Sequence, residues 1–158
     1  MLAAIRPDDW NFPLLLHVLG ASILLGALVT AATAQLLAWR RNAPADVVPY
    51  ARLSFRTLLF VSIPAWILMR LAAEWIADKE GWNDVDEEPA WLGIGYITSE
   101  LGGVLLLISV ILAGIGARRL GRSNGEKGET LVRVSTVLAV ILVIAYVITV
   151  WAMSAKPD

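Results

Sequence analysis

Four long apolar runs constrain the fold of this 158-residue chain more than any other feature. They cover residues 12–39, 57–77, 92–117 and 134–153, and each is long enough to cross the hydrocarbon core of a bilayer as an α-helix. Lipid offers no hydrogen-bond partners, so a span satisfies its backbone only if it is helical. The sequence therefore predicts one all-α membrane domain, residues 1–158, whose four transmembrane helices form an up-down bundle.

The second run has the shortest uninterrupted apolar part, because Arg70 and Glu74 follow Met69. A re-entrant half-helix is the alternative there, but it would place both flanking loops on one side of the membrane. Pro64 predicts a kink near the middle of this span. Before the span, Pro49 suits the first turn of a short interfacial helix that turns Tyr50, Leu53 and Phe55 toward the lipid boundary.

Charged residues at the span ends predict the orientation of the bundle. The loops after the first and third spans are basic, and the loop after the second span is acidic. By the positive-inside rule, both basic loops are cytoplasmic and both termini face outward. The basic residues are Arg40, Arg41, Arg52, Arg56, Arg118, Arg119, Arg122, Lys127 and Arg133; the acidic loop carries Asp78, Glu80, Asp84, Asp86, Glu87 and Glu88, opposed by Lys79.

Several function classes are disfavoured by composition. A net charge of −1 with no basic cluster argues against nucleic acid as a partner, and the absence of cysteine removes thiolate chemistry and disulfides. A single histidine cannot supply both axial ligands of a haem or a His-Glu-x-x-His zinc site. The acidic loop also lacks the ligand spacing of an EF-hand. No cofactor is implied, and we expect no enzymatic activity.

Ionisable residues within the spans are the best candidates for function, because each costs about 3 kcal/mol to insert into hydrocarbon. These residues are His17, Arg70, Glu74 and Glu100. With a rise of about 1.5 Å per residue, all four lie roughly 5–13 Å inside the outer ends of their helices. Tyr146 lies at a similar depth. A stripe of Gly20, Leu24, Ala27 and Ala31 shares a face with His17, which we therefore expect to point into the bundle.

Two interpretations of this polar layer remain open. In the first, it forms a site that binds or translocates a small molecule, proton or metal ion from the outer face. In the second, His17 is a neutral core imidazole, the ion pairs only fix helix packing, and the chain is a structural or accessory membrane subunit. The lipid bilayer is the expected partner in both, with a homo-oligomer or a larger membrane complex as a further possibility.

The residues that open and close the spans also carry a family resemblance. Leu14-Leu15-Leu16-His17-Val18-Leu19-Gly20, Pro64, Trp91-Leu92 and Lys156-Pro157 resemble the pattern of uncharacterised bacterial four-helix integral membrane proteins, which are distantly similar to the membrane part of copper-resistance protein D. The resemblance implies a multi-pass protein of the bacterial plasma membrane, copper handling as a theme, and His17 as a functional residue. Met69 and Met153 are the methionines near the outer layer.

Overall fold

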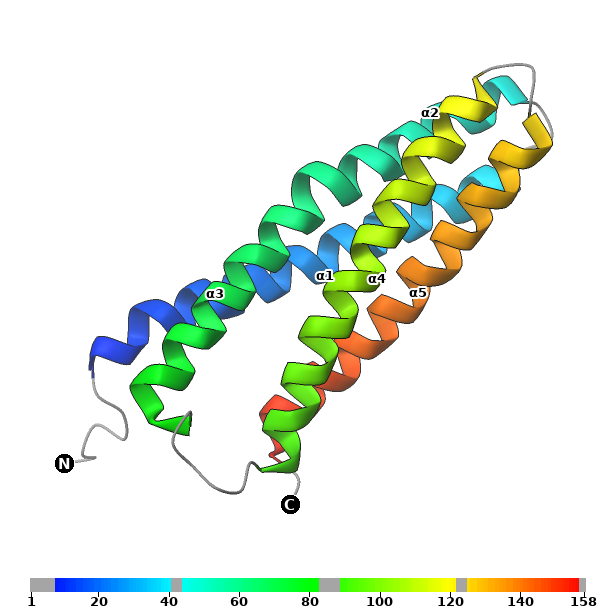
Figure 1. The fold of residues 1–158 in the computed structure, drawn as a ribbon. Helices are drawn as coiled ribbons and strands as arrows, with labels where there is room; N and C mark the ends of the chain where they lie inside the picture. Colours follow the sequence, from blue (N-terminus) through cyan, green and yellow to red (C-terminus); the bar gives the residue numbers. More distant parts are fainter. Residues whose placement is uncertain (1–7, 41–43, 83–88, 122–124, 157–158) are drawn as a thin grey trace.

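A computed structural model describes residues 8–40, 44–82, 89–121 and 125–156. Every element in this part of the chain is helical. The elements are the 3-10 turn Asp8–Trp10, α1 (Asn11–Trp39), α2 (Pro44–Thr57), the π-helical turn η2 (Leu58–Ser62), α3 (Ile63–Glu80), α4 (Ala90–Leu120) and α5 (Gly125–Ala155) (Figure 1). Four helical segments are long and apolar enough to cross a membrane: Asn11–Trp39, Val47–Glu80, Ala90–Leu120 and Lys127–Ala155. The predicted all-helical fold with four spans is thereby confirmed.

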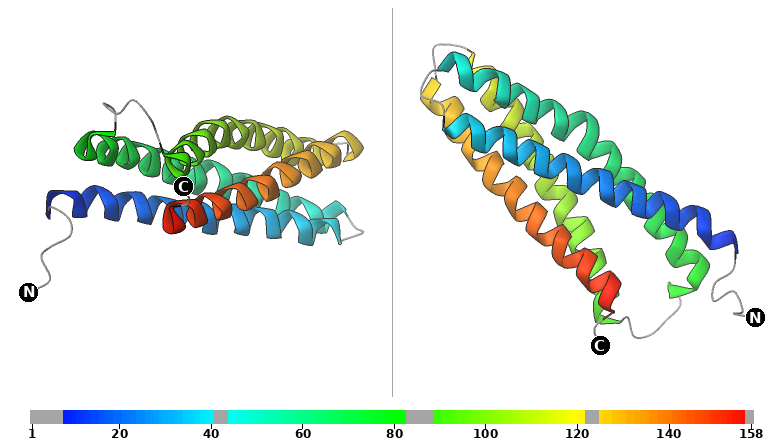
Figure 2. Two further views of the ribbon diagram at one scale, coloured as in Figure 1. Left: turned by 90° about the horizontal axis from the view of Figure 1, so that it is seen from below. Right: turned by 180° about the vertical axis from the view of Figure 1, so that it is seen from behind.

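The helices lie side by side as two pairs that separate toward one end of the bundle. This end holds the start of α1, the end of α3, the start of α4 and the end of α5 (Figures 1 and 2). Within the first pair, Lys79 Nζ lies 2.9 Å from Asp9 Oδ2. Within the second pair, Lys156 Nζ lies 4.9 Å from the centroid of the Trp91 ring. We call this the wide end. The opposite end, where α1, α2, α4 and α5 come together, is the narrow end (Figure 1).

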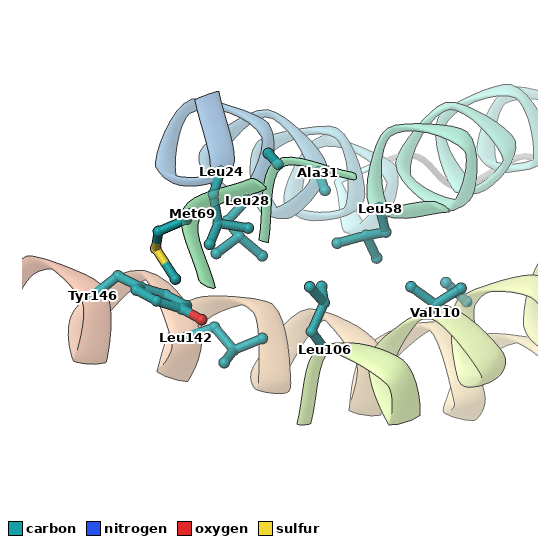
Figure 3. Packing of buried hydrophobic residues seen from close by; sticks show 11 residues of the cluster. Leu24, Leu28, Ala31, Leu58, Met69, Leu106, Val110, Leu142 and Tyr146 are labelled. Carbon is teal, nitrogen blue, oxygen red and sulfur yellow. The ribbon is translucent and has the colours of Figure 1, made fainter. Parts of the chain in front are cut away.

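A leucine-rich core joins the two pairs between the wide and narrow ends. Leu24, Leu28, Leu58, Leu106 and Leu142 are fully buried and contact one another across the bundle (Figure 3). The outward faces are equally apolar, with large side chains such as Phe60 (68% exposed) and Leu71 (65% exposed) on the surface. A bundle that is apolar both inside and outside is suited to lipid as its solvent, so the structure is that of a multi-pass membrane protein.

Small residues let the first pair of helices approach closely. Gly20, Ala27 and Ala31 of α1 are buried, as the predicted stripe requires. A Cβ atom on Gly20 would lie 2.8 Å from the backbone nitrogen of Met69. The backbones of α1 and α3 are therefore in direct contact one turn beyond His17.

Buried polar pairs join the helices in the narrow half of the bundle. The hydroxyls of Ser109 and Ser135 are 2.9 Å apart, and Ser135 Oγ also donates to the Ser109 carbonyl at 2.9 Å. The hydroxyl of Thr136 donates to Gln35 Oε1 on α1. Such bonds between spans stabilise helix packing in lipid.

The second span differs from its prediction in two ways. A helix begins at Pro44 instead of Pro49 and continues through η2 into α3, so there is no separate interfacial helix between these residues. Phe55 packs against Gly114 of α4 instead of facing the lipid boundary, because glycine leaves space for its ring there. The backbone adapts to Pro64, which has no N–H, through a π turn in which the Ile63 N–H bonds to the Leu58 carbonyl.

Several charges predicted to lie in loops belong to helices. Arg52 and Arg56 lie on α2, Arg133 lies on α5, and Asp78 and Glu80 lie in the last turn of α3. The rest of the predicted acidic loop, Asp84, Asp86, Glu87 and Glu88, lies outside the described residues, as do Arg41, Arg122 and Pro157.

Candidate functional site

A cavity of about 550 Å³ lies between the two helix pairs at the wide end. Its walls come from α1, α3, α4 and α5 and are mainly apolar, with aromatic rings from Trp82, Trp91 and Tyr96. At its open end it reaches the exposed residues Glu80 and Lys156, and at its inner end it reaches Leu25 and the buried Tyr146. The cavity therefore extends from the end of the bundle to the edge of the leucine core.

His17 lines this cavity from α1. Its Nδ1 atom lies 3.0 Å from the carbonyl oxygen of Met69 on α3. A carbonyl only accepts hydrogen bonds, so Nδ1 donates, and in the neutral imidazole Nε2 is then left as an acceptor. The close approach of the helices at Gly20 brings the Met69 carbonyl within reach. His17 points inward, as predicted, and the contact fixes which of its nitrogens can serve the cavity.

Arg70 lines the cavity from α3 and is held by two carboxylates. Glu74 on the next turn accepts from one guanidinium nitrogen, and Glu100 Oε1 on α4 lies 3.3 Å from the other. The guanidinium carbon also lies 5.3 Å from the ring centroid of Tyr96. This cluster brings together three of the four ionisable residues that the sequence singled out.

The two carboxylates of this cluster do not line the cavity. The side chains of Glu74 and Glu100 are 45% and 67% exposed, compared with 22% for Arg70. They lie on the outer side of the α3–α4 pairing and approach Arg70 from there. The predicted site of four ionisable groups is thus divided: His17 and Arg70 face the cavity, while Glu74 and Glu100 offset the charge of Arg70 from outside.

Two residues with buried hydroxyls, Ser99 and Tyr146, also contribute to the cavity. Ser99 is 8% exposed and Tyr146 is 5% exposed, and neither hydroxyl has a hydrogen-bond partner in the described part of the chain. Both residues line the cavity. Tyr146 was predicted from its depth, and Figure 3 places it beside Met69 and Leu142. Ser99 was missed as a site residue, although its place beside Glu100 on a small-residue face was visible in the sequence.

The observed helix ends change the depths that can be counted for these residues. Counted from the observed helix ends at about 1.5 Å per residue, His17 and Glu74 lie about 9 Å deep, and Arg70, Glu100 and Tyr146 lie about 14–15 Å deep. For the residues on α3, α4 and α5, the counted depths are greater than predicted. At the wide end each of these helices is two or three residues longer than its predicted span.

Metal ligands are sparse around the site. Within residues 8–40, 44–82, 89–121 and 125–156, no group of three or more His, Asp or Glu side chains is arranged to hold a metal ion. The methionines Met69 and Met153 both line the cavity together with His17. The site as a whole is thus a mainly apolar chamber whose polar side chains include one imidazole, one charge-compensated guanidinium and several hydroxyls.

Comparisons of the chain with protein-family models, with curated proteins and with solved structures found no match. The resemblance to bacterial four-helix membrane proteins and to copper-resistance protein D therefore stays an expectation from the sequence.

Proposed function

We propose that this protein binds a small molecule in the outer half of the membrane, in the cavity lined by His17, Arg70, Ser99 and Tyr146, for transport, sensing or proton transfer. One observation supports this above all: an apolar cavity of about 550 Å³ is lined by His17, by Arg70 and by two residues, Ser99 and Tyr146, whose buried hydroxyls have no hydrogen-bond partner in the described part of the chain. Buried polar groups normally find partners, and a bound molecule would supply them. The proposal includes no catalytic step.

The proposed orientation is an up-down bundle in the bacterial plasma membrane with both termini and the cavity on the outer side. Support comes from the two ends of the helices. At the narrow end, Arg40 directly follows α1 and Arg118 lies in the last turn of α4. At the wide end, Asp78 and Glu80 lie in the last turn of α3. Positive residues favour the cytoplasmic side, and this supports an orientation with the wide end outside.

A structural or accessory subunit is the alternative function. The cluster of Arg70, Glu74 and Glu100 favours it, because an ion network that joins α3 to α4 can serve packing alone. However, the serine pair and the Thr136–Gln35 bond already join helices in the narrow half. Packing does not require a cavity at the other end, so we favour the binding site.

Single-cysteine labelling tests the proposal, because the natural chain has no cysteine. Ser99→Cys adds a nearly isosteric thiol to the cavity wall. We expect a charged, membrane-impermeant methanethiosulfonate to modify it from the outer face of sealed vesicles. Lys127→Cys, exposed near the start of α5, should react only from the opposite face and so reports the orientation.

Ser109→Cys is the matched control. Ser109 is also a buried serine on α4, but it does not line the cavity and is bonded to Ser135. We expect its thiol to react at least tenfold more slowly than the thiol at position 99. Equal, slow labelling of both variants in the folded protein would mean that the chamber is closed to water, and the proposed binding function would be wrong.

A further inference from the structure

The cavity has a side that faces lipid between α1 and α5. Val18 and Ser22 of α1 and Val150 of α5 line the cavity and are also exposed. Val18 is 52% exposed and Val150 is 49% exposed. Counted from the helix ends, Val18 lies about 10 Å deep and Val150 about 7 Å deep, well inside the spans. Both residues lie within segments able to cross a membrane, so the outward part of each side chain faces the lipid of the bilayer.

Contacts between α3 and α4 close the inner part of the opposite side of the cavity. Arg70 bonds to Glu100 across these helices, and one turn deeper the Trp66 indole donates from Nε1 to the Ser99 carbonyl at 2.9 Å. The ring of Trp66 fits against Gly103, where a Cβ atom would collide with it. Since α1 also packs on α3 and α4 packs on α5, the side that remains at this level lies between α1 and α5.

The charge of the cavity favours an uncharged ligand. Arg70 is the one cation in the deep part of the described lining, and two carboxylates already compensate it, so an anion would find no free positive partner there. The other polar side chains of the lining include His17, whose Nε2 is an acceptor in the neutral tautomer, Ser22, and Thr149, whose hydroxyl donates to the Ala145 carbonyl; the hydroxyls of Ser99 and Tyr146 are buried and have no partner in the described residues. A ligand O–H would satisfy the His17 acceptor, and the ligand oxygen would accept from the Ser99 or Tyr146 hydroxyl once that hydroxyl turns toward it.

We propose that the cavity opens laterally to the lipid between α1 and α5, and that its ligand is an uncharged, lipid-soluble phenol, a class that includes quinols. The phenol O–H donates to His17 Nε2, and its oxygen accepts from Tyr146 or Ser99. The ring and its apolar tail lie against the aromatic and aliphatic walls and extend through the opening. This inference rests on the proposed binding function and names its ligand class and route of entry.

Protection of the cysteine at position 99 tests the ligand class. The probe is 4-octylphenol added to the membranes, and the matched compound is 4-octylanisole, which has the same ring and tail but no O–H. We expect 4-octylphenol to slow modification of Ser99→Cys at least tenfold, and the anisole to need roughly tenfold higher concentration. The same phenol should give little protection when His17→Leu is added, because the acceptor is lost.

Tryptophan substitutions test the route. Val18→Trp or Val150→Trp fills the opening, and we expect either to slow the onset of protection at least tenfold. Val147→Trp is the control, since Val147 is equally exposed on α5 but does not line the cavity. Protection that develops as fast in the filled variants as in the control would overturn the lateral opening.

The outcomes separate this inference from the function on which it rests. A reactive thiol at position 99 that the phenol does not protect, or that the anisole protects equally well, would overturn the ligand class and leave the binding function standing. A thiol at position 99 that does not react at all would overturn both.

Discussion

Replacing Gly20 by alanine should separate α1 from α3 and release His17. The new Cβ atom would lie 2.8 Å from the Met69 nitrogen, 3.0 Å from the Met69 Cα atom and 3.1 Å from the Ala65 carbonyl oxygen. All three are backbone atoms, so no side chain can rotate away. Ordinary contact begins at about 3.4 Å, and α1 must therefore move outward by roughly 0.6 Å.

The expected cost follows from three opposing contributions. Overpacking a close contact costs about 1–3 kcal/mol, and alanine regains about 1 kcal/mol of helix propensity over glycine. Moving α1 also stretches the 3.0 Å bond from His17 Nδ1 to the Met69 carbonyl, which is worth about 1 kcal/mol. The net destabilisation is about 1–3 kcal/mol.

Gly26→Ala is the matched control for this measurement. Gly26 lies on the same helix, and nothing lies within 4 Å of the position its Cβ would take. We expect it to leave the protein as stable as the wild type or slightly more stable. Reversible unfolding in mixed micelles titrated with SDS, followed by far-UV circular dichroism, gives the free energies. If the two alanine variants were equally stable, the close α1–α3 contact would be wrong.

Three further predictions concern other contacts. Trp66→Phe should cost about 1 kcal/mol in the same unfolding assay, since phenylalanine cannot donate to the carbonyl on α4. A double-mutant cycle with Ser109→Ala and Ser135→Ala should give a coupling of about 0.6 kcal/mol, and an absent coupling would contradict the bond. The hydrogen bond from Lys79 holds the pKa of Asp9 below its ordinary 3.8, so this pair stabilises the fold above about pH 4 and the contribution is lost as the pH falls through the folded pKa. The stability difference between wild type and Lys79→Met should therefore disappear in acid, and one that persists at pH 2 would refute the contact.

Part of the candidate site could be predicted from the sequence. The inward direction of His17 followed from its place beside a stripe of small residues, and the pairing of Arg70 with Glu74 followed from their spacing of four. The sequence did not predict that Glu74 and Glu100 lie outside the cavity. The helical period shows which residues share a face of a helix, but it does not show which other helix packs against that face. Ser99 was missed because a hydroxyl within a span is common and gains interest only when its partners are known to be absent.

The second span shows the same limit for the backbone. Pro49 and Pro64 both signal interruptions, yet the helix runs from Pro44 to Glu80 with a π turn between its two parts. Sequence rules for proline predict the free energy that each one costs within a helix. These rules do not include the contacts that α2 makes with other helices, such as the packing of Phe55 against Gly114 of α4, which favour the continuous helix.

The sequence by itself determined that the chain is helical and has four segments able to cross a membrane, because in lipid the length of an apolar run and the backbone's need for hydrogen bonds leave no other choice. Only the tertiary structure decided that the helix pairs separate at one end and enclose a cavity. The shape of that space depends on contacts between residues far apart in the chain, such as Gly20 with Met69 and Trp66 with Gly103, which no local pattern specifies.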